Sequence, residues 1–496
     1  MFKNILYKTL LVTILALTAT SCNKYLELRP QDGITRDKFW QTKEQIQAAV
    51  IGCYSSMQIT SGRTPAETFF VWGELRGDMI APGIGMSIDE TNVINVSILS
   101  TNAVTDWRNI YRVINFCNNV IDFAPGVRGI DNTLTQEQLN AYLSEALTVR
   151  ALMYFYLVRS FGDVPLKLKS TSSDSELEQL AKNTQKQVLD QIVADLKTAE
   201  GYAVTTYGDN ASDKGRVTRY TVNALQADVY LWMDNYNETI VACDKIISSG
   251  KFGLVTGNNA WFNTVFGTGN SNEAIFELQF DSQVLNPYFN MFTTSRRRYL
   301  AGPSVVEQVY TVDPLNENNY DIRGIDAAVR TGDQSIYKYI GLNRDVARTQ
   351  DVSYAHWIFY RYADILLLKA EACAYVGRGQ DALNIVEQIR IRANALITSA
   401  ETPSPEDGEG VANYVLAERS RELAYEGKRW YDLLRNAKHN NYARISLLTE
   451  AAIISVPGAV QQSAINKLKD PNSHYFPINQ YEIQTDPNLI QNPFYK

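Results

Sequence analysis

The stretch from Leu143 to Leu166 reads LSEALTVRALMYFYLVRSFGDVPL and carries the strongest helical pattern in the chain. Its apolar residues recur three or four positions apart and would form one broad helix face: Leu143, Leu147, Ala151, Tyr154, Leu157, Val158 and Phe161. Gly162 and Pro165 end this helix, because glycine can adopt the left-handed cap conformation and proline cannot extend a helix. Arg150 lies within the apolar face, so we expect it to be half-buried and paired with a carboxylate.

Other helices are predicted in pairs. Apolar periodicity indicates helices over 43–57, 106–123 and 184–199, and helical hairpins over 220–249 and 362–393. Each hairpin is a two-helix unit of about 34 residues with alanines where the helices cross, which is typical of tetratricopeptide-like repeats. The predicted fold is therefore all-α: a tetratricopeptide-like helical repeat scaffold with four helix pairs, 43–57 with 106–123, 143–161 with 184–199, and the two hairpins.

Two regions lack helical periodicity. Glycines and prolines are frequent between residues 60 and 105, which predicts a long, structured loop. Residues 251–360 are also irregular and are rich in aromatic residues. The chain has 29 tyrosines and 7 tryptophans, and aromatic side chains outside a regular core are common in binding surfaces. The alternative is that a large domain packs its loops with aromatic residues.

The N-terminus resembles a lipoprotein signal. Lys3 and Lys8 precede a short apolar run, and small residues then lead to Cys22. Residues 1–21 are therefore predicted to be a signal peptide and Cys22 to be lipidated, which would anchor the chain to a membrane surface. An ordinary signal peptide that happens to contain a cysteine is the alternative. No other stretch is apolar for long enough to cross a bilayer.

The remaining cysteines are far apart in sequence and have no metal-binding spacing: Cys53, Cys117, Cys243 and Cys373. Each falls in an apolar helical pattern, so we expect small core residues rather than disulfides. A bridge between two of them stays open in an oxidising compartment.

A charged stretch near the C-terminus, ERSRELAYEGKRWYDLLR over 418–435, is predicted to be one helix. Glu418, Glu422 and Glu426 recur every four residues and would repel one another unless cations pair with them. We expect an ion-paired helix that docks on the repeats, and Arg150 is a candidate partner for one of these glutamates. A site for a ligand is the alternative.

Composition and motifs argue against catalysis and nucleic-acid binding. The net charge of −7 is unfavourable for contact with nucleic acid. There are only three histidines, and no zinc-protease, serine-hydrolase or phosphate-loop motif is present. The sequence therefore predicts neither an enzyme nor a site for a metal or cofactor.

Four runs resemble the SusD/RagB family of surface nutrient-binding lipoproteins. The stretch at 143–166 fits the pattern E-A-x-x-x-R-A-x-x-Y-F-x-L-x-x-x-F-G-D-V-P-L, and the hairpin over 220–250, the run at 418–435 and the closing run FPINQYEIQTDPNLIQNPFY over 476–495 are also similar. The closing run departs from the family at Asn479, Asp486 and Phe494, so this C-terminal latch could differ locally. The resemblance implies an outer-membrane lipoprotein that captures an oligosaccharide for a SusC-like TonB-dependent transporter. Capture of a peptide or another nutrient is the alternative.

In this family the ligand surface lies on loops outside the helical repeats, which implies a role for the two irregular regions. The candidate ligand-binding residues combine aromatic faces with polar partners: Trp72, Arg76, Asp78, Tyr288, Phe289, Phe292, Arg296 and Tyr299. The chain is thus divided into a signal peptide (1–21), an N-terminal part with three helix pairs (22–250), an irregular aromatic-rich region (251–360) and a C-terminal part (361–496) with the fourth pair, the charged helix and the latch.

Overall fold

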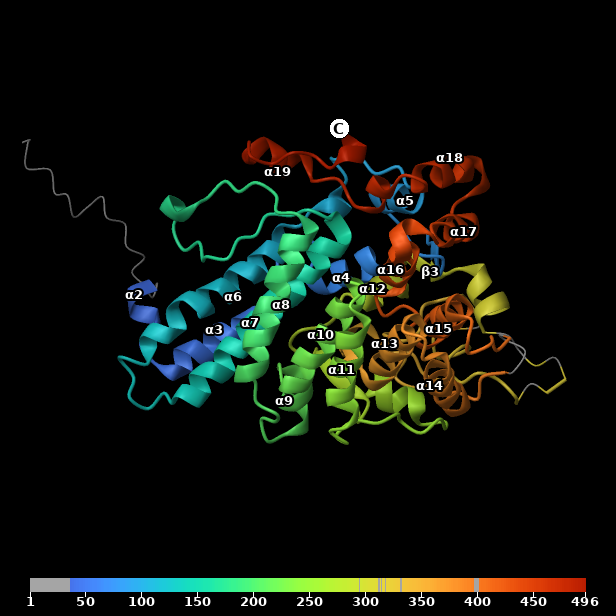
Figure 1. Ribbon diagram of the computed structural model, residues 1–496, viewed down its shortest axis with the longest axis horizontal. Coiled ribbons are helices and arrows are strands. Elements are labelled where there is room, and N and C mark those ends of the chain that lie inside the picture. Colours follow the sequence, from blue (N-terminus) through green and yellow to red (C-terminus); the bar gives the residue numbers. More distant parts are fainter. Residues whose placement is uncertain are drawn as a thin grey trace, which may run out of the picture.

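The computed structural model describes residues 36–496 except 294, 311–312, 314, 317, 331 and 397–400. The predicted signal peptide and Cys22 lie outside the described residues. The fold is mostly helical, and all four predicted helix pairs are confirmed. They are α3 (Lys43–Ser55) with α6 (Arg108–Val127), α7 (Gln136–Phe161) with α8 (Gln185–Tyr202), α10 (Arg219–Trp232) with α11 (Tyr236–Ile247), and α13 (Tyr362–Tyr375) with α14 (Gly379–Arg392). Figure 1 shows these pairs side by side along the long axis of the molecule.

The other elements are shorter. The remaining helices are α2 (Arg36–Phe39), α4 (Pro65–Glu74), α5 (Ile88–Ile94), α9 (Asn210–Gly215), α12 (Tyr288–Phe292), α15 (Gly408–Glu422), α16 (Arg429–Tyr442), α17 (Ser446–Ser455), α18 (Gly458–Leu468) and α19 (Gln480–Thr485). Single 3-10 or π turns are η2 (Ala103–Thr105), η3 (Asp174–Glu176), η4 (Asn263–Gly267), η5 (Val305–Val309), η6 (Gln350–Val352), η8 (Pro471–His474) and η9 (Pro493–Tyr495). The strands are β1 (Ile80–Pro82), β2 (Ala274–Leu278), β3 (Tyr299–Ala301) and β4 (Trp357–Arg361).

Helix α7 is longer than predicted but ends as expected. Thr135 caps its first turn by accepting a hydrogen bond from the Gln138 amide, and Gly162 follows its last residue with a φ of +75°. The C-terminal segment closes over this end, because the Phe476 amide donates to the carbonyl of Ser160 (2.8 Å) and the Asn492 side chain donates to that of Phe161 (3.1 Å).

Arg150 is paired with a carboxylate, as predicted, but it is buried and not half-buried, and the proposed partner was wrong. Its Nη2 lies 2.8 Å from Asp195 on α8, and Nη1 donates to Asn118 on α6. Arg150 therefore ties the first two helix pairs together instead of reaching the glutamates of 418–435.

The prediction of a loop over 60–105 was wrong where α4 and α5 form. Thr64 caps α4, Pro65 occupies its first turn, and α4 is buried on every face, including Phe69, Phe70 and Trp72 at 0% exposure. Because α4 has no solvent-facing side, its sequence lacks the alternation of polar and apolar residues that marks a surface helix.

The single helix predicted over 418–435 is in fact two helices. Helix α15 ends at Glu422, and α16 begins at Arg429 after a turn in which Tyr425 and Gly427 have positive φ. This turn packs directly on α4, where a Cβ added to Gly73 would lie 1.9 Å from the Gly427 carbonyl oxygen. The ion pairing predicted for this stretch is confirmed.

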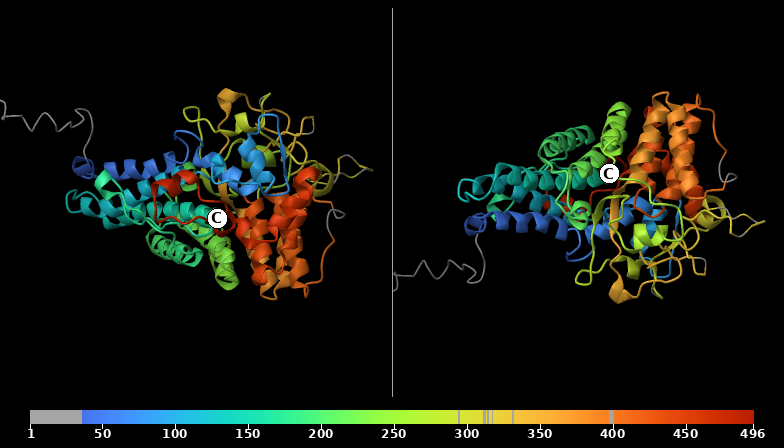
Figure 2. Two further views of the ribbon diagram at one scale, coloured as in Figure 1. Left: turned by 90° about the horizontal axis from the view of Figure 1, so that it is seen from above. Right: turned by 90° about the horizontal axis from the view of Figure 1, so that it is seen from below.

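The four predicted core cysteines, at 53, 117, 243 and 373, are buried and free of disulfides. Between α11 and α13 the chain forms mainly turns and three strands. Strands β2 and β4 pair with each other, and β3 pairs with β1, which follows α4, so that there are two antiparallel two-stranded sheets. The two views in Figure 2 place this irregular region, with α4 and α5, on one side of the helical pairs.

Candidate functional site

The two segments that break the helical pattern meet at β1 and β3. Ile80 is opposite Ala301, and the contact continues beyond β1 because the amides of Gly83 and Gly85 donate to the carbonyls of Arg298 (2.8 Å) and Arg297 (3.0 Å). The sequence predicted that both segments belong to the ligand-binding region. The structure brings them into direct contact.

Glycine is required for this close approach. A Cβ added to Gly85 would lie 1.7 Å from the carbonyl oxygen of Arg296, and one added to Gly83 would lie 2.3 Å from that of Arg297. Such contacts cannot be relieved by a side-chain movement, since both atoms belong to the backbone. The two glycines therefore fix the loop that follows β1 against the residues that precede β3.

An ion-pair cluster also stabilises the contact between the loop after β1 and the residues before β3. The Arg298 guanidinium binds Glu67 of α4 (2.8 Å) and Glu90 of α5, and the Tyr299 hydroxyl donates to Glu90 (2.6 Å). Burial raises the pKa of the Glu90 carboxyl, but the Arg298 guanidinium outweighs this effect and holds the pKa below its ordinary value. Glu90 is therefore ionised at neutral pH and takes part in packing.

Next to this cluster, several side chains face solvent. Ile84 and Ile88 are 85% and 72% exposed, which is unusual for isoleucine, and Arg296 is also exposed. Arg297 is paired with Asp333 (2.8 Å), but Arg296 has no ion pair within the described part of the chain. We call Ile84, Gly85, Met86, Ile88 and Arg296 the ribbon surface.

Five of the predicted ligand-binding side chains are buried: Trp72, Arg76, Tyr288, Phe292 and Tyr299. Trp72 donates from its indole nitrogen to the carbonyl of Val104 (2.8 Å). The Tyr288 ring packs against Tyr339 and Trp357, with centroids 4.6 and 5.6 Å away. Rings enclosed in this way pack the interior of the irregular region and present no face to a ligand.

Arg76 is buried and Asp78 is partly exposed, and both are paired with the C-terminal part of the chain. The Arg76 guanidinium sits between the rings of Trp430 (4.3 Å) and Phe476 (3.9 Å), and burial lowers its pKa to about 10. Asp78 pairs with Arg429 at the start of α16 (2.6 Å). Both residues hold the C-terminal helices against α4.

Of the predicted site residues, Arg296 is well exposed, and Phe289 and Asp78 are partly exposed. Sequence reasoning missed Ile84 and Ile88. The signal that could have found them is two isoleucines beside two glycines and a proline in APGIGMSI, a composition that favours an exposed turn over a buried helix or strand.

The comparisons with known proteins agree with this architecture. A model described as the SusD family matches residues 258–495, and one described as "Starch-binding associating with outer membrane" matches residues 24–231. The chain belongs to the SusD/RagB family.

Similar proteins include two SusD-like proteins of Formosa agariphila. The protein P38 is 27% identical over 88% of this chain and 92% of its own length, and P2 is 26% identical over 85% and 89%. A SusD superfamily structure from Bacteroides vulgatus covers 92% of this chain and 100% of its own, with a TM-score of 0.72 and 20% identity. One from Parabacteroides distasonis covers 91% and 99%, with a TM-score of 0.69 and 24% identity. These structures share the fold.

SusD-like proteins are in general glycan-binding proteins that associate with the outer membrane and have no known catalytic role. Among the described residues of this SusD/RagB chain, no helix is long and apolar enough to cross a membrane. The same part of the chain contains no group of three or more His, Cys, Asp or Glu residues arranged to hold a metal ion.

Proposed function

We propose that this SusD-like protein captures an oligosaccharide at the cell surface and delivers it to a SusC-like TonB-dependent transporter. Lipid attached to Cys22 would hold it on the outer membrane. The observation that carries the proposal is the ribbon surface, where the two irregular segments meet and expose isoleucines and an arginine, Arg296, that has no ion pair with any residue the structure describes. Family membership supports the ligand class, since the matched model is described as starch-binding.

The chemistry of the ribbon surface suits a hydroxyl-rich ligand. Ile84 and Ile88 offer apolar contact for the C–H faces of sugar rings, and Arg296 has five N–H donors for hydroxyl oxygens. The glycines and the ion-pair cluster beneath hold the backbone in place, so little conformational entropy would be lost on binding.

Capture of an extended peptide is the second candidate, and one observation favours it. The sheet formed by β1 and β3 has only two strands. A peptide could add to an outer edge through main-chain hydrogen bonds, with Ile84 and Ile88 beside it.

Binding of the soluble chain, starting after Cys22, to plant, host and microbial glycans and to mixed peptides would test the proposal. We expect glycan binding that the double variant Ile84→Ser, Arg296→Ala weakens about tenfold or more, because central interface residues each contribute 1 kcal/mol or more. Binding of peptides alone would favour the second candidate.

A matched control uses exposed residues on the helical scaffold. Ile391 on α14 is 73% exposed and Arg378 is exposed beside Asp381, so Ile391→Ser, Arg378→Ala repeats the same chemical change elsewhere. This variant should bind like the wild type. Equal loss in both variants would argue against a site at the ribbon surface.

The membrane attachment and the partner need separate measurements. We expect Cys22→Ser to release the full chain from outer-membrane fractions. We also expect the wild-type chain to co-purify with a TonB-dependent transporter from detergent extracts of its source bacterium. Recovery without such a transporter would contradict the delivery role but not glycan capture.

A further inference from the structure

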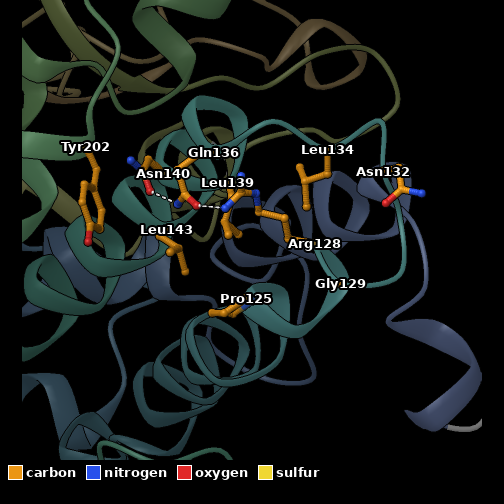
Figure 3. Close-up of a pocket in the computed structure, with 10 residues that line it drawn as sticks. All are labelled: Pro125, Arg128, Gly129, Asn132, Leu134, Gln136, Leu139, Asn140, Leu143 and Tyr202. Carbon is orange, nitrogen blue, oxygen red and sulfur yellow. Dashed lines mark hydrogen bonds between the residues drawn. The ribbon is translucent and has the colours of Figure 1, made fainter.

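A separate cavity of about 600 Å³ lies at the turn between α6 and α7. Its walls are the end of α6, the connecting loop, the first turns of α7 and the last residue of α8 (Figure 3). Figure 1 places this turn at the end of the molecule near α2, far along the long axis from β3. None of the residues that line it belongs to the ribbon surface. We call it the arm pocket.

Hydrogen bonds hold the walls of the arm pocket together. Asp131 accepts hydrogen bonds from the amides of Lys43 (2.9 Å) and Thr133 (2.8 Å), which fixes the loop between the helices. The Ser144 hydroxyl donates to the carbonyl of Ala199 (2.9 Å), so the end of α8 lies beside the first half of α7. This packing brings Tyr202, the last residue of α8, to the rim of the arm pocket.

A row of planar polar side chains crosses the arm pocket. Arg128 donates to the Gln136 carbonyl oxygen (2.5 Å), and the Gln136 amide nitrogen donates to Asn140 (2.7 Å). Figure 3 shows this row between Tyr202 at one end and Asn132 at the other. Gln136 is satisfied on both sides, whereas the Asn140 amide nitrogen and the other N–H groups of Arg128 have no partner in the described structure.

The remaining lining is apolar or neutral. Leu134 and Leu139 are buried beneath the polar row, and Tyr202 keeps 37% of its surface exposed. Arg128 has no carboxylate within ion-pair distance among the described residues, and it interacts with Glu137 only at longer range. The arm pocket thus combines one accessible aromatic ring, unused planar donors and an apolar floor.

We propose that the arm pocket binds a sugar ring, as a second saccharide site distinct from the ribbon surface. The Tyr202 ring would pack on the C–H face of the sugar, while Asn140 and Arg128 donate to its hydroxyl oxygens. The volume lies within the range of small-ligand sites. The proposal rests on the proposed function only for the source of the sugar, an oligosaccharide captured at the cell surface.

Saturation-transfer difference NMR on the soluble chain would test this, with methyl glycosides of glucose, galactose and glucuronic acid as probes at millimolar concentration. We expect signal from at least one probe. Tyr202→Ser and Asn140→Ala should each weaken its affinity about two- to tenfold. Tyr481→Ser, at a tyrosine of 54% exposure on α19, is the matched control and should leave the signal unchanged.

The ribbon-surface double variant separates the two proposals. Signal that persists in Ile84→Ser, Arg296→Ala and falls in Tyr202→Ser supports the arm pocket even if the ribbon surface binds nothing. Signal lost only in the ribbon-surface variant overturns the arm pocket and leaves the proposed function intact. Signal from none of the probes overturns the arm pocket as well. Urea unfolding of Tyr202→Ser and of the ribbon-surface variant should match the wild type, since Tyr202, Ile84 and Arg296 are exposed.

Discussion

The helical scaffold and the irregular region satisfy their buried backbone groups in different ways. Helices satisfy theirs internally, so the scaffold can bury apolar side chains between them. The irregular region has only short ladders, at β2–β4 and β1–β3, and long polar side chains bind several of its other carbonyls. Asn286 donates to the carbonyl of Ala355 (2.8 Å), Arg344 to that of Ile322 (2.9 Å) and Lys338 to that of Glu422 (3.0 Å).

Buried charge is also unevenly distributed. Arg361, at the end of β4, binds Glu273, Glu422 and Glu426 at 2.5–2.9 Å, and these side chains are at most 1% exposed. Arg323 adds pairs to Glu418 and Glu422, and Lys338 adds one to Glu426. We call this set the charge cage; its members are Glu273, Arg323, Lys338, Arg361, Glu418, Glu422 and Glu426. It joins the irregular region to the turn between α15 and α16.

The difference between the scaffold and the irregular region shows why residue type alone predicted the wrong site residues. In the irregular region, aromatic and arginine side chains stabilise the fold, as helical hydrogen bonds and aliphatic packing do in the scaffold. A tyrosine or arginine there is thus no evidence for a ligand. Exposure without a partner, as at Arg296, is the better indicator.

Breaking the charge cage should give the largest effect. Arg361→Ala leaves three buried carboxylates without their shared cation, which we expect to lower the free energy of unfolding by about 3–5 kcal/mol. Chemical denaturation would measure this. Arg378→Ala removes an exposed pair and should change stability by less than about 1 kcal/mol. A similar small change in Arg361→Ala would show that the charge cage does not hold the irregular region.

Arg150→Ala tests a buried pair within the scaffold. The single carboxylate of Asp195 loses its cation, so we expect a loss of about 3 kcal/mol. Adding Asp195→Ala should recover part of this loss, because no buried charge is then left unpaired. Thermal unfolding of Arg150→Ala at the wild-type temperature would contradict the prediction.

Glu74 is a buried carboxyl that lacks the cationic partners of the charge cage. Its contribution to stability should therefore change with pH in the opposite direction to that of Glu422. One carboxyl oxygen accepts from the Gly427 amide (2.7 Å), the other has no partner in the described structure, and burial raises the pKa of Glu74 from 4.5 to about 8. The Arg392, Arg361 and Arg323 guanidinium groups instead outweigh burial and hold the pKa of Glu422 well below its ordinary value.

For Glu74, the unfolded chain releases its proton above about pH 4.5 while the folded chain keeps it up to about pH 8. Stability therefore falls as pH rises through this window, by about 1.4 kcal/mol per pH unit. Glu74→Gln removes the effect, so the variant should gain about 2 kcal/mol on the wild type between about pH 5.5 and 7. Urea unfolding at both pH values measures this, and parallel stability curves would contradict it.

The scaffold could be predicted because its signal is local. The four helix pairs follow from 3.6-residue periodicity and from caps such as Gly162, which depend only on neighbouring residues. Helix α4 was not predicted because burial on all sides removes the periodicity. The break between α15 and α16 was not predicted because it depends on the contact of Gly427 with Gly73, which are far apart in the chain.

The site could be predicted only as a region. The sequence identified both segments that form the ribbon surface, but whether Trp72 faces solvent depends on long-range packing that no local pattern encodes. Arg150 illustrates the same limit: its burial and charge predict a carboxylate partner, while the choice of Asp195 over Glu422 depends on how the helices pack.

The smallest effects on stability come from three consecutive arginines that span the boundary between structure and site. Arg298 binds Glu67 and Glu90, Arg297 binds Asp333, and Arg296 has no ion pair among the described residues. We expect alanine substitution to cost about 1–2 kcal/mol at Arg298, about 0.5–1 kcal/mol at Arg297 and less than about 0.5 kcal/mol at Arg296. Glycan affinity, measured on the folded fraction, should follow the reverse order, with the greatest loss at Arg296. The three substitutions are chemically identical and adjacent. If the losses of glycan affinity followed the same order as the losses of stability, the substitutions would affect binding only by destabilising the fold, and the ribbon surface would not contact the ligand.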